Sequence, residues 1–101
     1  MSYIKSEYKD LDRYDDYEVI FYYKKGTRIY HNPYGPSYIT KSGYVEYWVE
    51  GIYHRLDGPA IIYSDGEEEY YINGEYLSKE EFEVHPERLK FLGKEYLLCL
   101  I

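Results

Sequence analysis

Short runs of apolar and aromatic residues alternate with turn-forming pairs through the middle of the chain. The runs cover residues 37–41, 44–49, 60–64 and 67–72. Each is followed by a pair in which glycine succeeds a polar residue, namely Ser42-Gly43, Glu50-Gly51, Asp65-Gly66 and Asn73-Gly74. Such pairs signal tight hairpin turns, because glycine supplies the positive φ that these turns need. The pattern predicts an antiparallel meander of roughly six to eight short strands with local connections.

Alternate residues of a strand lie on opposite faces of a sheet, so the second run of each pair sorts into two sets. One set is Val45, Tyr47 and Val49 with Glu68, Tyr70 and Ile72, and we expect it to face the core. The other set is Tyr44, Glu46, Trp48, Glu67, Glu69 and Tyr71. We expect this second set to form an exposed stripe that is both acidic and aromatic.

The meander is built from an internal repeat. Residues 31–53 and 54–76 align without a gap and share His, Gly-Pro, Glu and Tyr at equivalent positions. A partial copy precedes them, since Tyr22-Tyr23-Lys24-Lys25-Gly26 parallels Tyr47-Trp48-Val49-Glu50-Gly51. Repeats of this kind bury hydrophobic surface by stacking on their neighbours. The prediction is one domain, 1–101, made of an N-terminal segment 1–30, repeats 31–53 and 54–76, and a helical cap at 77–101.

Helical signals begin after the second repeat. Ser78 and Glu81 have the spacing of a capping box, which predicts a short helix at 79–84 with Phe82 directed at the core. Pro86 is suited to open a second helical segment through Leu89 and Phe91. Gly93 then ends that segment.

The two ends of the chain are less regular. Residues 96–101 form the most apolar stretch, which we expect to be a buried strand or helical turn with Cys99 inside. Residues 1–18 are charge-dense and mixed, which favours a first helix or an ordered arm, and strand signals resume at 17–23. The expected fold class is therefore mainly β with a small α part: stacked hairpin repeats capped by a short C-terminal helical segment.

Composition and charge exclude several classes of protein. Seventeen tyrosines among 101 residues argue against a disordered tail, and a single cysteine argues against a disulfide scaffold. No apolar run approaches the roughly 18 residues of a membrane-spanning helix, and the N-terminus lacks a signal-peptide pattern. The formal charge of −7 disfavours nonspecific binding to nucleic acid or to an anionic membrane. Most of the excess negative charge lies in residues 31–77, which contain eight acidic residues and only two basic ones, Lys41 and Arg55.

The second repeat carries a recognisable pattern. His54-Arg55-Leu56-Asp57-Gly58-Pro59-Ala60, followed by Asp65-Gly66 and Asn73-Gly74, resembles the H-R-x-x-G-P-A hairpin repeat of tailed-bacteriophage and giant-virus proteins. That repeat is similar to the MORN-type repeat. The first unit departs from it, with Asn32 in place of Arg and Ser37 in place of Ala. The resemblance implies a stacked-hairpin sheet and a viral origin, and it implies no chemistry, because repeat scaffolds host many functions.

Motifs for catalysis or metal binding are weak. His31, His54 and His85 are the histidines of the chain, and none has the C-x-x-C or H-x-x-H spacing of a metal site. We expect His31 and His54 to bond a neighbouring hairpin, and Arg55 to pair with Asp57. Nucleophile elbows and phosphate-binding loops are absent from the sequence. We therefore predict no enzyme activity, no cofactor and no metal.

The acidic and aromatic stripe supports the most specific functional prediction. Carboxylates at strand spacing imitate a phosphate backbone, and aromatic side chains supply the anchors typical of protein interfaces. We expect a small viral protein that acts in the cytoplasm of a bacterial host. It would bind a host protein with a basic surface, such as a defence nuclease, and inhibit it.

Two alternatives remain open. The first is a protein that sequesters a small ligand such as a nucleotide signal, with His54, Arg55 and Asp57 as the binding residues and tyrosines stacking on the base. The second is a structural protein that self-associates, for example as a homodimer, by pairing of its sheet edges. Neither direct nucleic-acid binding nor membrane binding is expected.

Overall fold

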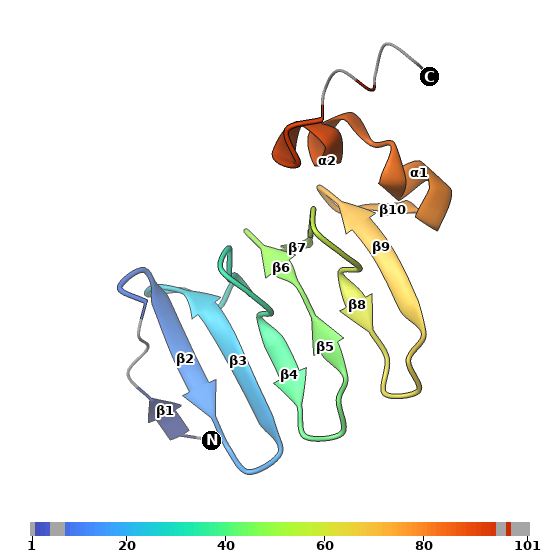
Figure 1. Ribbon diagram of the computed structural model, residues 1–101. Helices are drawn as coiled ribbons and strands as arrows, with labels where there is room; N and C mark the ends of the chain where they lie inside the picture. Colours follow the sequence, from blue (N-terminus) through green and yellow to red (C-terminus); the bar gives the residue numbers. More distant parts are fainter. Residues whose placement is uncertain (1, 5–7, 95–96, 98–101) are drawn as a thin grey trace.

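The structure, a computed structural model, describes residues 2–4, 8–94 and 97, and in this part of the chain it is mainly β (Figure 1). The strands are β1 (Ser2–Ile4), β2 (Leu11–Asp15), β3 (Val19–Lys24), β4 (Tyr38–Thr40), β5 (Val45–Glu46), β6 (Trp48–Val49), β7 (Ile52–Tyr53), β8 (Ile61–Ile62), β9 (Glu68–Ile72) and β10 (Glu75–Leu77). Two short helices follow, α1 (Lys79–Glu83) and α2 (Pro86–Phe91).

The strands form an antiparallel meander, as the turn pattern predicts. Eight of them make one sheet in the order β1-β2-β3-β4-β5-β8-β9-β10, and β6 and β7 form a separate hairpin between β5 and β8. Every pairing is antiparallel and follows chain order. The mainly β fold class with a helical C-terminal segment is confirmed.

The N-terminal segment is a pair of strands, so the alternative of a first helix is wrong. β2 pairs along its whole length with β3, from Leu11 opposite Lys24 to Asp15 opposite Ile20. The charged residues there follow a strand period of two: Arg13 Nη2 donates a hydrogen bond of 3.0 Å to Asp15 Oδ2, two residues on. Residues two apart share a face on a strand, whereas they do not face each other on a helix.

The predicted strand 44–49 is divided at Tyr47. Tyr47 donates its N–H to the carbonyl of Ala60, which precedes β8, whereas its own carbonyl accepts from His54, which follows β7. The chain thus changes its pairing partner at this residue. β5 therefore belongs to the main sheet, and β6 belongs to the hairpin with β7.

The β6–β7 and β9–β10 connections are tight turns of the same kind. Both central residues have positive φ, 52° and 79° for Glu50 and Gly51 and 51° and 81° for Asn73 and Gly74. Positive φ at both positions is the type I′ arrangement, which matches the twist of the flanking strands. The two loop residues therefore fix the register in which Ile72 faces Glu75.

The two faces of the sheet differ in their side chains. Cross-strand partners share a face, so one row consists of Tyr14, Phe21, Tyr38, Glu46, Ile61 and Glu69. We call this side the aromatic face. The other side carries Leu11, Tyr22, Ser37, Ala60 and Ile72, all at least nine-tenths buried, and we call it the loop-covered face. Loops at 32–36 and 55–59 lie over it.

The helices pack at the C-terminal end of the loop-covered face. Ser78 and Glu81 form the predicted capping box, and Phe82 is 2% exposed against Ile72 and Leu77. Arg88 of α2 donates from Nη1 to the carbonyl of Leu56. Pro86 opens α2 as expected, and Gly93, with φ 71°, follows its end. The expectation of a buried segment around Cys99 lies outside the described residues.

Most of the sheet is a single layer. The molecule measures 50 × 31 × 18 Å, and its radius of gyration is 15.0 Å. A compact domain of 100 residues has a radius of about 13 Å. Figure 1 shows both helices gathered beside β9 and β10, which leaves the rest of the sheet without a helical layer. Among the described residues, no helix is long and apolar enough to span a membrane.

Candidate protein-binding face

Aromatic rings run in an unbroken series across the aromatic face. Successive ring centroids lie between 4.0 and 5.5 Å apart in the order Tyr14, Phe21, Tyr23, Tyr30, Trp48, Tyr53, Tyr71, Tyr76. The repeat explains the series, because Tyr30, Tyr53 and Tyr76 occupy one repeat position and Trp48 and Tyr71 another. Tilted and edge-on pairs of this kind are favourable beyond the area they bury. The rings therefore stabilise one another without a second layer above them.

Glu46 lies inside this series and accepts three hydrogen bonds. The donors are the Tyr44 hydroxyl, the Trp48 indole N–H at 2.8 Å and the Tyr53 hydroxyl at 3.2 Å. Burial, together with the Glu46 carboxylate, raises the pKa of both Tyr44 and Tyr53 well above the usual phenol value. The carboxylate thus replaces the water that these polar ring atoms would otherwise need.

Glu69 occupies the equivalent place in the second repeat. Its carboxylate accepts from the Tyr63 hydroxyl at 3.0 Å and from the Tyr71 hydroxyl at 3.2 Å. The hydrogen bond to Glu69 raises the pKa of Tyr63, and burial is the larger cause of the raised pKa of Tyr71. Ile61 pairs with both Glu46 and Glu69 in the sheet and is 3% exposed. The two carboxylates therefore flank a buried apolar side chain.

The predicted stripe lies on one face, although its acids differ in their surroundings. Tyr44 and Trp48 both donate hydrogen bonds to Glu46, and Tyr71 donates one to Glu69. Glu46 and Glu69 are half-buried, whereas Glu67 is exposed. Glu67 is thus the carboxylate of the stripe that is open to water. Sequence reasoning missed Tyr53, Tyr63 and Tyr76, whose repeat positions and strand pairing place them on the same face.

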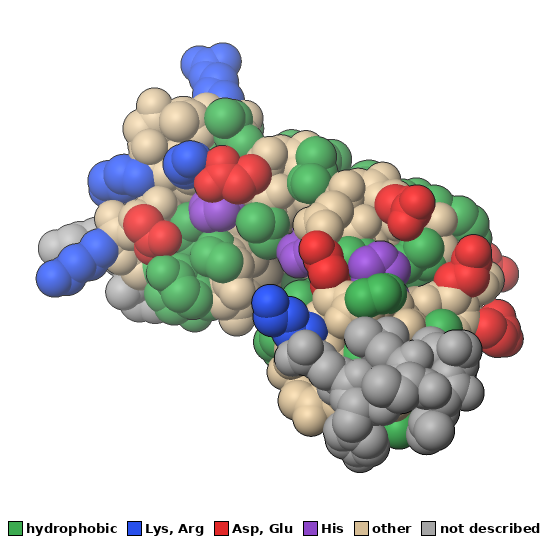
Figure 2. Space-filling model, turned by 90° about the horizontal axis from the view of Figure 1, so that it is seen from above, with side chains coloured by type: hydrophobic (Ala, Val, Ile, Leu, Met, Phe, Trp, Pro, Cys, Tyr) green, Lys and Arg blue, Asp and Glu red, His purple; other side chains and the backbone are tan. Residues whose placement is uncertain are grey.

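Negative charge is concentrated at the β9–β10–α1 end of the molecule. Residues 67–87 contain eight glutamates and one lysine. The net charge of this segment is therefore as large as the formal charge of −7 of the whole chain. Seven of these glutamates are exposed: Glu67, Glu68, Glu75, Glu80, Glu81, Glu83 and Glu87. In Figure 2 acidic side chains lie at both ends of the molecule, whereas most of the visible lysine and arginine side chains lie at the end opposite to β9 and β10. A basic surface would be attracted to the C-terminal end of the sheet.

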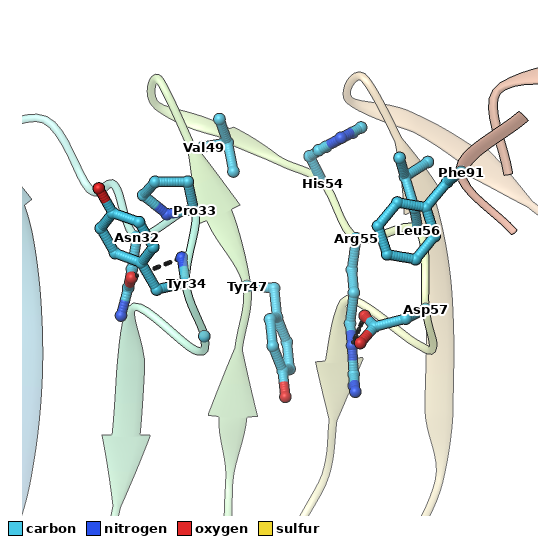
Figure 3. A pocket seen from close by; sticks show the side chains of 11 residues that line it. Asn32, Pro33, Tyr34, Tyr47, Val49, His54, Arg55, Leu56, Asp57 and Phe91 are labelled. Atoms are coloured by element: carbon cyan, nitrogen blue, oxygen red, sulfur yellow. Dashed lines mark hydrogen bonds and ion pairs between the residues drawn. The ribbon is translucent and has the colours of Figure 1, made fainter.

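The alternative ligand residues line a groove on the loop-covered face. His54, Arg55 and Asp57 form one wall, and Asn32, Pro33 and Tyr34 form the other, around a volume of 170 Å³ (Figure 3). Phe91 of α2 closes one side. The structure thus brings the three predicted residues together in one cavity.

Arg55 is held in place by hydrogen bonds and by stacking on a tyrosine ring. Its Nε donates to Asp57 at 2.8 Å, its Nη1 donates to the carbonyl of Pro59 at 3.0 Å, and its guanidinium stacks 4.0 Å from the Tyr47 ring centre. In the first repeat Asn32 makes the matching bond, with Nδ2 2.9 Å from the carbonyl of Pro36. These contacts hold each Gly-Pro loop on the sheet. The charge of Arg55 is thus paired with Asp57 and is not free to meet an anionic ligand.

The histidines stabilise turns, as the repeat predicts. His31 Nδ1 accepts the N–H of Glu50 at 2.8 Å, and His54 Nδ1 accepts the N–H of Asn73 at 2.9 Å. His85 caps α2 by accepting the N–H of Glu87. Within residues 2–4, 8–94 and 97, no group of three or more His, Cys, Asp or Glu side chains is placed to hold a metal ion.

Comparison of the chain with family models, with curated proteins and with solved structures found no match. The resemblance to the H-R-x-x-G-P-A repeat therefore stays a prediction from the residues quoted above.

Proposed function

We propose that this chain is a small protein-binding module that docks its aromatic face and acidic end on a basic surface of a partner protein. The observation that carries the proposal is the make-up of that face. Its described strand positions hold mainly aromatic side chains and carboxylates, together with Val19, Thr40 and Ile61, and none of them holds lysine or arginine. The helices pack on the opposite face, against Tyr70 and Leu77.

The rings suit the centre of a protein interface. Tyr and Trp are enriched among the residues that contribute most to binding, because they bury a large area and lose little side-chain entropy. Here their conformations are already fixed by contacts between rings and by the Glu46 and Glu69 carboxylates. Binding therefore costs little further ordering of these side chains.

The charge suits a surface that normally binds nucleic acid. Exposed glutamates at the β9–β10–α1 end offer negative charge without a phosphate backbone. Such a field speeds the encounter with a basic partner and weakens as salt rises. The partner we propose is a host nuclease or another basic nucleic-acid-binding defence protein, inhibited in the bacterial cytoplasm by occupation of its basic surface.

Capture from host lysate tests the proposal. Immobilised chain should retain a basic nucleic-acid-binding protein at low salt and release it at high salt. The purified partner should bind either the chain or duplex DNA, so that added DNA displaces it. Retention of no host protein at either salt, or a partner that binds DNA and the chain at the same time, would contradict the proposal.

A further inference from the structure

The tips of the β6–β7 and β9–β10 hairpins each bond back to the hairpin before them. The Gly51 N–H donates to the Tyr30 carbonyl at 3.0 Å, and the Gly74 N–H donates to the Tyr53 carbonyl at 2.9 Å. Both donors are glycines of an X-Gly turn, and both acceptors are tyrosines of the aromatic series. The same main-chain bond thus links successive repeats.

Tyr76 is the repeat equivalent of Tyr30 and Tyr53, and it lies on β10, the edge strand of the sheet. Tyr76 faces Tyr71 in the β9–β10 register, and the Tyr71 carbonyl accepts the N–H of Arg55, on the side away from β10. In antiparallel pairing such residues do not bond each other, so the N–H and carbonyl of Tyr76 point outward. In the described part of the chain, no strand pairs with this outer edge.

At the N-terminal end of the repeats, the equivalent turn is bonded to a side chain. Gly26 is the repeat equivalent of Gly51, and its N–H is bonded to the Asp12 carboxylate at 2.9 Å. The N-terminal end therefore has a side-chain cap, whereas the C-terminal end stops at β10, whose outer edge no other described strand pairs. The Tyr76 ring is 63% exposed and ends the aromatic series, 5.4 Å from Tyr71.

Acidic side chains are exposed on this edge strand and on α1, the helix that packs against β9 and β10. Glu75 on β10 and Glu80 and Glu83 on α1 are all exposed, against the single cation Lys79. A strand that adds to a sheet edge gains main-chain hydrogen bonds from any sequence, and its side chains set specificity. The charge at this edge selects basic side chains.

We infer that β10 accepts an extended, basic segment of the partner protein as an additional strand of the sheet. The inference rests on the proposed function and names the mode of binding. The added segment would bond to the Tyr76 carbonyl, as glycine N–H groups bond to Tyr30 and Tyr53. One of its side chains would lie on the Tyr76 ring and continue the aromatic face.

A pair of synthetic peptides provides the first test. One is acetyl-(Arg-Val)3-amide. The other has the same sequence with a methyl group on every backbone nitrogen, which keeps the charge and removes the donors on both edges. The plain peptide should bind at least about tenfold more tightly, because a methylated edge forms no main-chain bonds. It should also slow hydrogen exchange of the Tyr76 amide, as followed by NMR.

A matched pair of variants provides the second test. Tyr76→Pro removes the outward N–H without removing a β9–β10 bond, and Tyr76→Thr removes the ring and keeps the N–H. The proline variant should bind the plain peptide more weakly than the threonine variant. The peptide comparison on the natural chain stands even if the proline variant does not fold.

The outcomes separate the two proposals. Equal binding of both peptides, with an unprotected Tyr76 amide, would overturn strand addition and leave docking through the aromatic face intact. Binding of neither peptide would count against both, because the acidic end would then attract no basic ligand. Tighter binding of the plain peptide than of the methylated one, together with slowed hydrogen exchange of the Tyr76 amide, would support strand addition at the β10 edge.

Discussion

His54 Nδ1 accepts the N–H of Asn73 at 2.9 Å, across nineteen residues, and so ties the first residue of the second repeat to its closing turn. Asn73 has a φ of 51°, a conformation that side-chain-bearing residues adopt at a cost. His31 makes the matching bond to Glu50, whose φ is 52°. An unprotonated imidazole nitrogen is therefore part of each turn.

Acid should destabilise the protein through His54. Burial lowers the pKa of His54 below the ordinary histidine value of 6.5, so the unfolded chain binds more protons than the folded one near that pH. The contribution of His54 to the free energy of unfolding is fully present above pH 6.5. It is lost as the pH falls from there through the pKa of His54 in the folded protein. Urea denaturation between neutral and mildly acidic pH measures the slope. His54→Gln should flatten it, and an unchanged slope would contradict this role.

The Glu46 carboxylate should contribute more to stability than an exposed acid on the same face. Glu46→Gln replaces one charged acceptor oxygen by a donor amide among three donors, so the free energy of unfolding should fall by about 1–3 kcal/mol. Glu67→Gln is the matched control, because Glu67 is exposed, and it should leave stability unchanged. Equal effects of the two variants in urea denaturation would contradict the arrangement around Glu46.

Tyrosine ionisation should be delayed in the folded protein. Burial and hydrogen bonds to Glu46 or Glu69 raise the pKa values of Tyr44, Tyr53, Tyr63 and Tyr71 above the ordinary phenol value of 10.0. The stability that these groups contribute is complete below pH 10 and is lost as pH rises through their folded values. Tyrosinate absorbance should therefore rise in two stages, the later one together with loss of the β-sheet signal in circular dichroism. A single rise at the ordinary phenol value with the sheet intact would contradict the prediction.

Gly58 should be required where its repeat equivalent Gly35 is not. A Cβ at Gly58 would lie 2.8 Å from Arg55 Cζ, whereas one at Gly35 would meet Asn32 Nδ2 at 3.9 Å. Gly58→Ala should displace Arg55 from Tyr47 and lower the free energy of unfolding by about 1–3 kcal/mol. Gly35→Ala should be neutral or stabilising by up to about 1 kcal/mol. Equal changes in melting temperature for Gly58→Ala and Gly35→Ala would contradict this prediction, because they would show that Arg55 moves away from the added methyl group at little cost.

The sequence alone supports much of the fold because the hairpins and caps are local. Polar-Gly pairs mark the turns, Ser78 and Glu81 mark the capping box, and the repeated histidine marks a bond within each unit. The division at Tyr47 was not predictable in this way, because the change of pairing partner depends on β8 and the residue after β7.

The candidate face was predicted in part for the same reason. Alternation along the chain placed Tyr44, Glu46 and Trp48 on one face, and in the structure Tyr44 and Trp48 both bond to Glu46. The Tyr53 hydroxyl reaches Glu46 from a neighbouring hairpin, so its position depends on register between elements. Whether a carboxylate is half-buried or exposed also depends on such neighbours, as Glu46 and Glu67 show.

The affinity of the captured partner for two charge-reversal variants tests the central claim most directly. Glu67 and Glu68 are adjacent and exposed, Glu67 aligns with Glu69 on the aromatic face, and Glu68 pairs with Ile62 on the opposite face. Glu67→Lys and Glu68→Lys change the net charge equally. We predict that Glu67→Lys weakens binding about tenfold or more at low salt and that Glu68→Lys, which belongs to the acidic end but lies on the opposite face, weakens it less. Equal effects of the two variants, or a larger effect of Glu68→Lys, would contradict binding through the aromatic face.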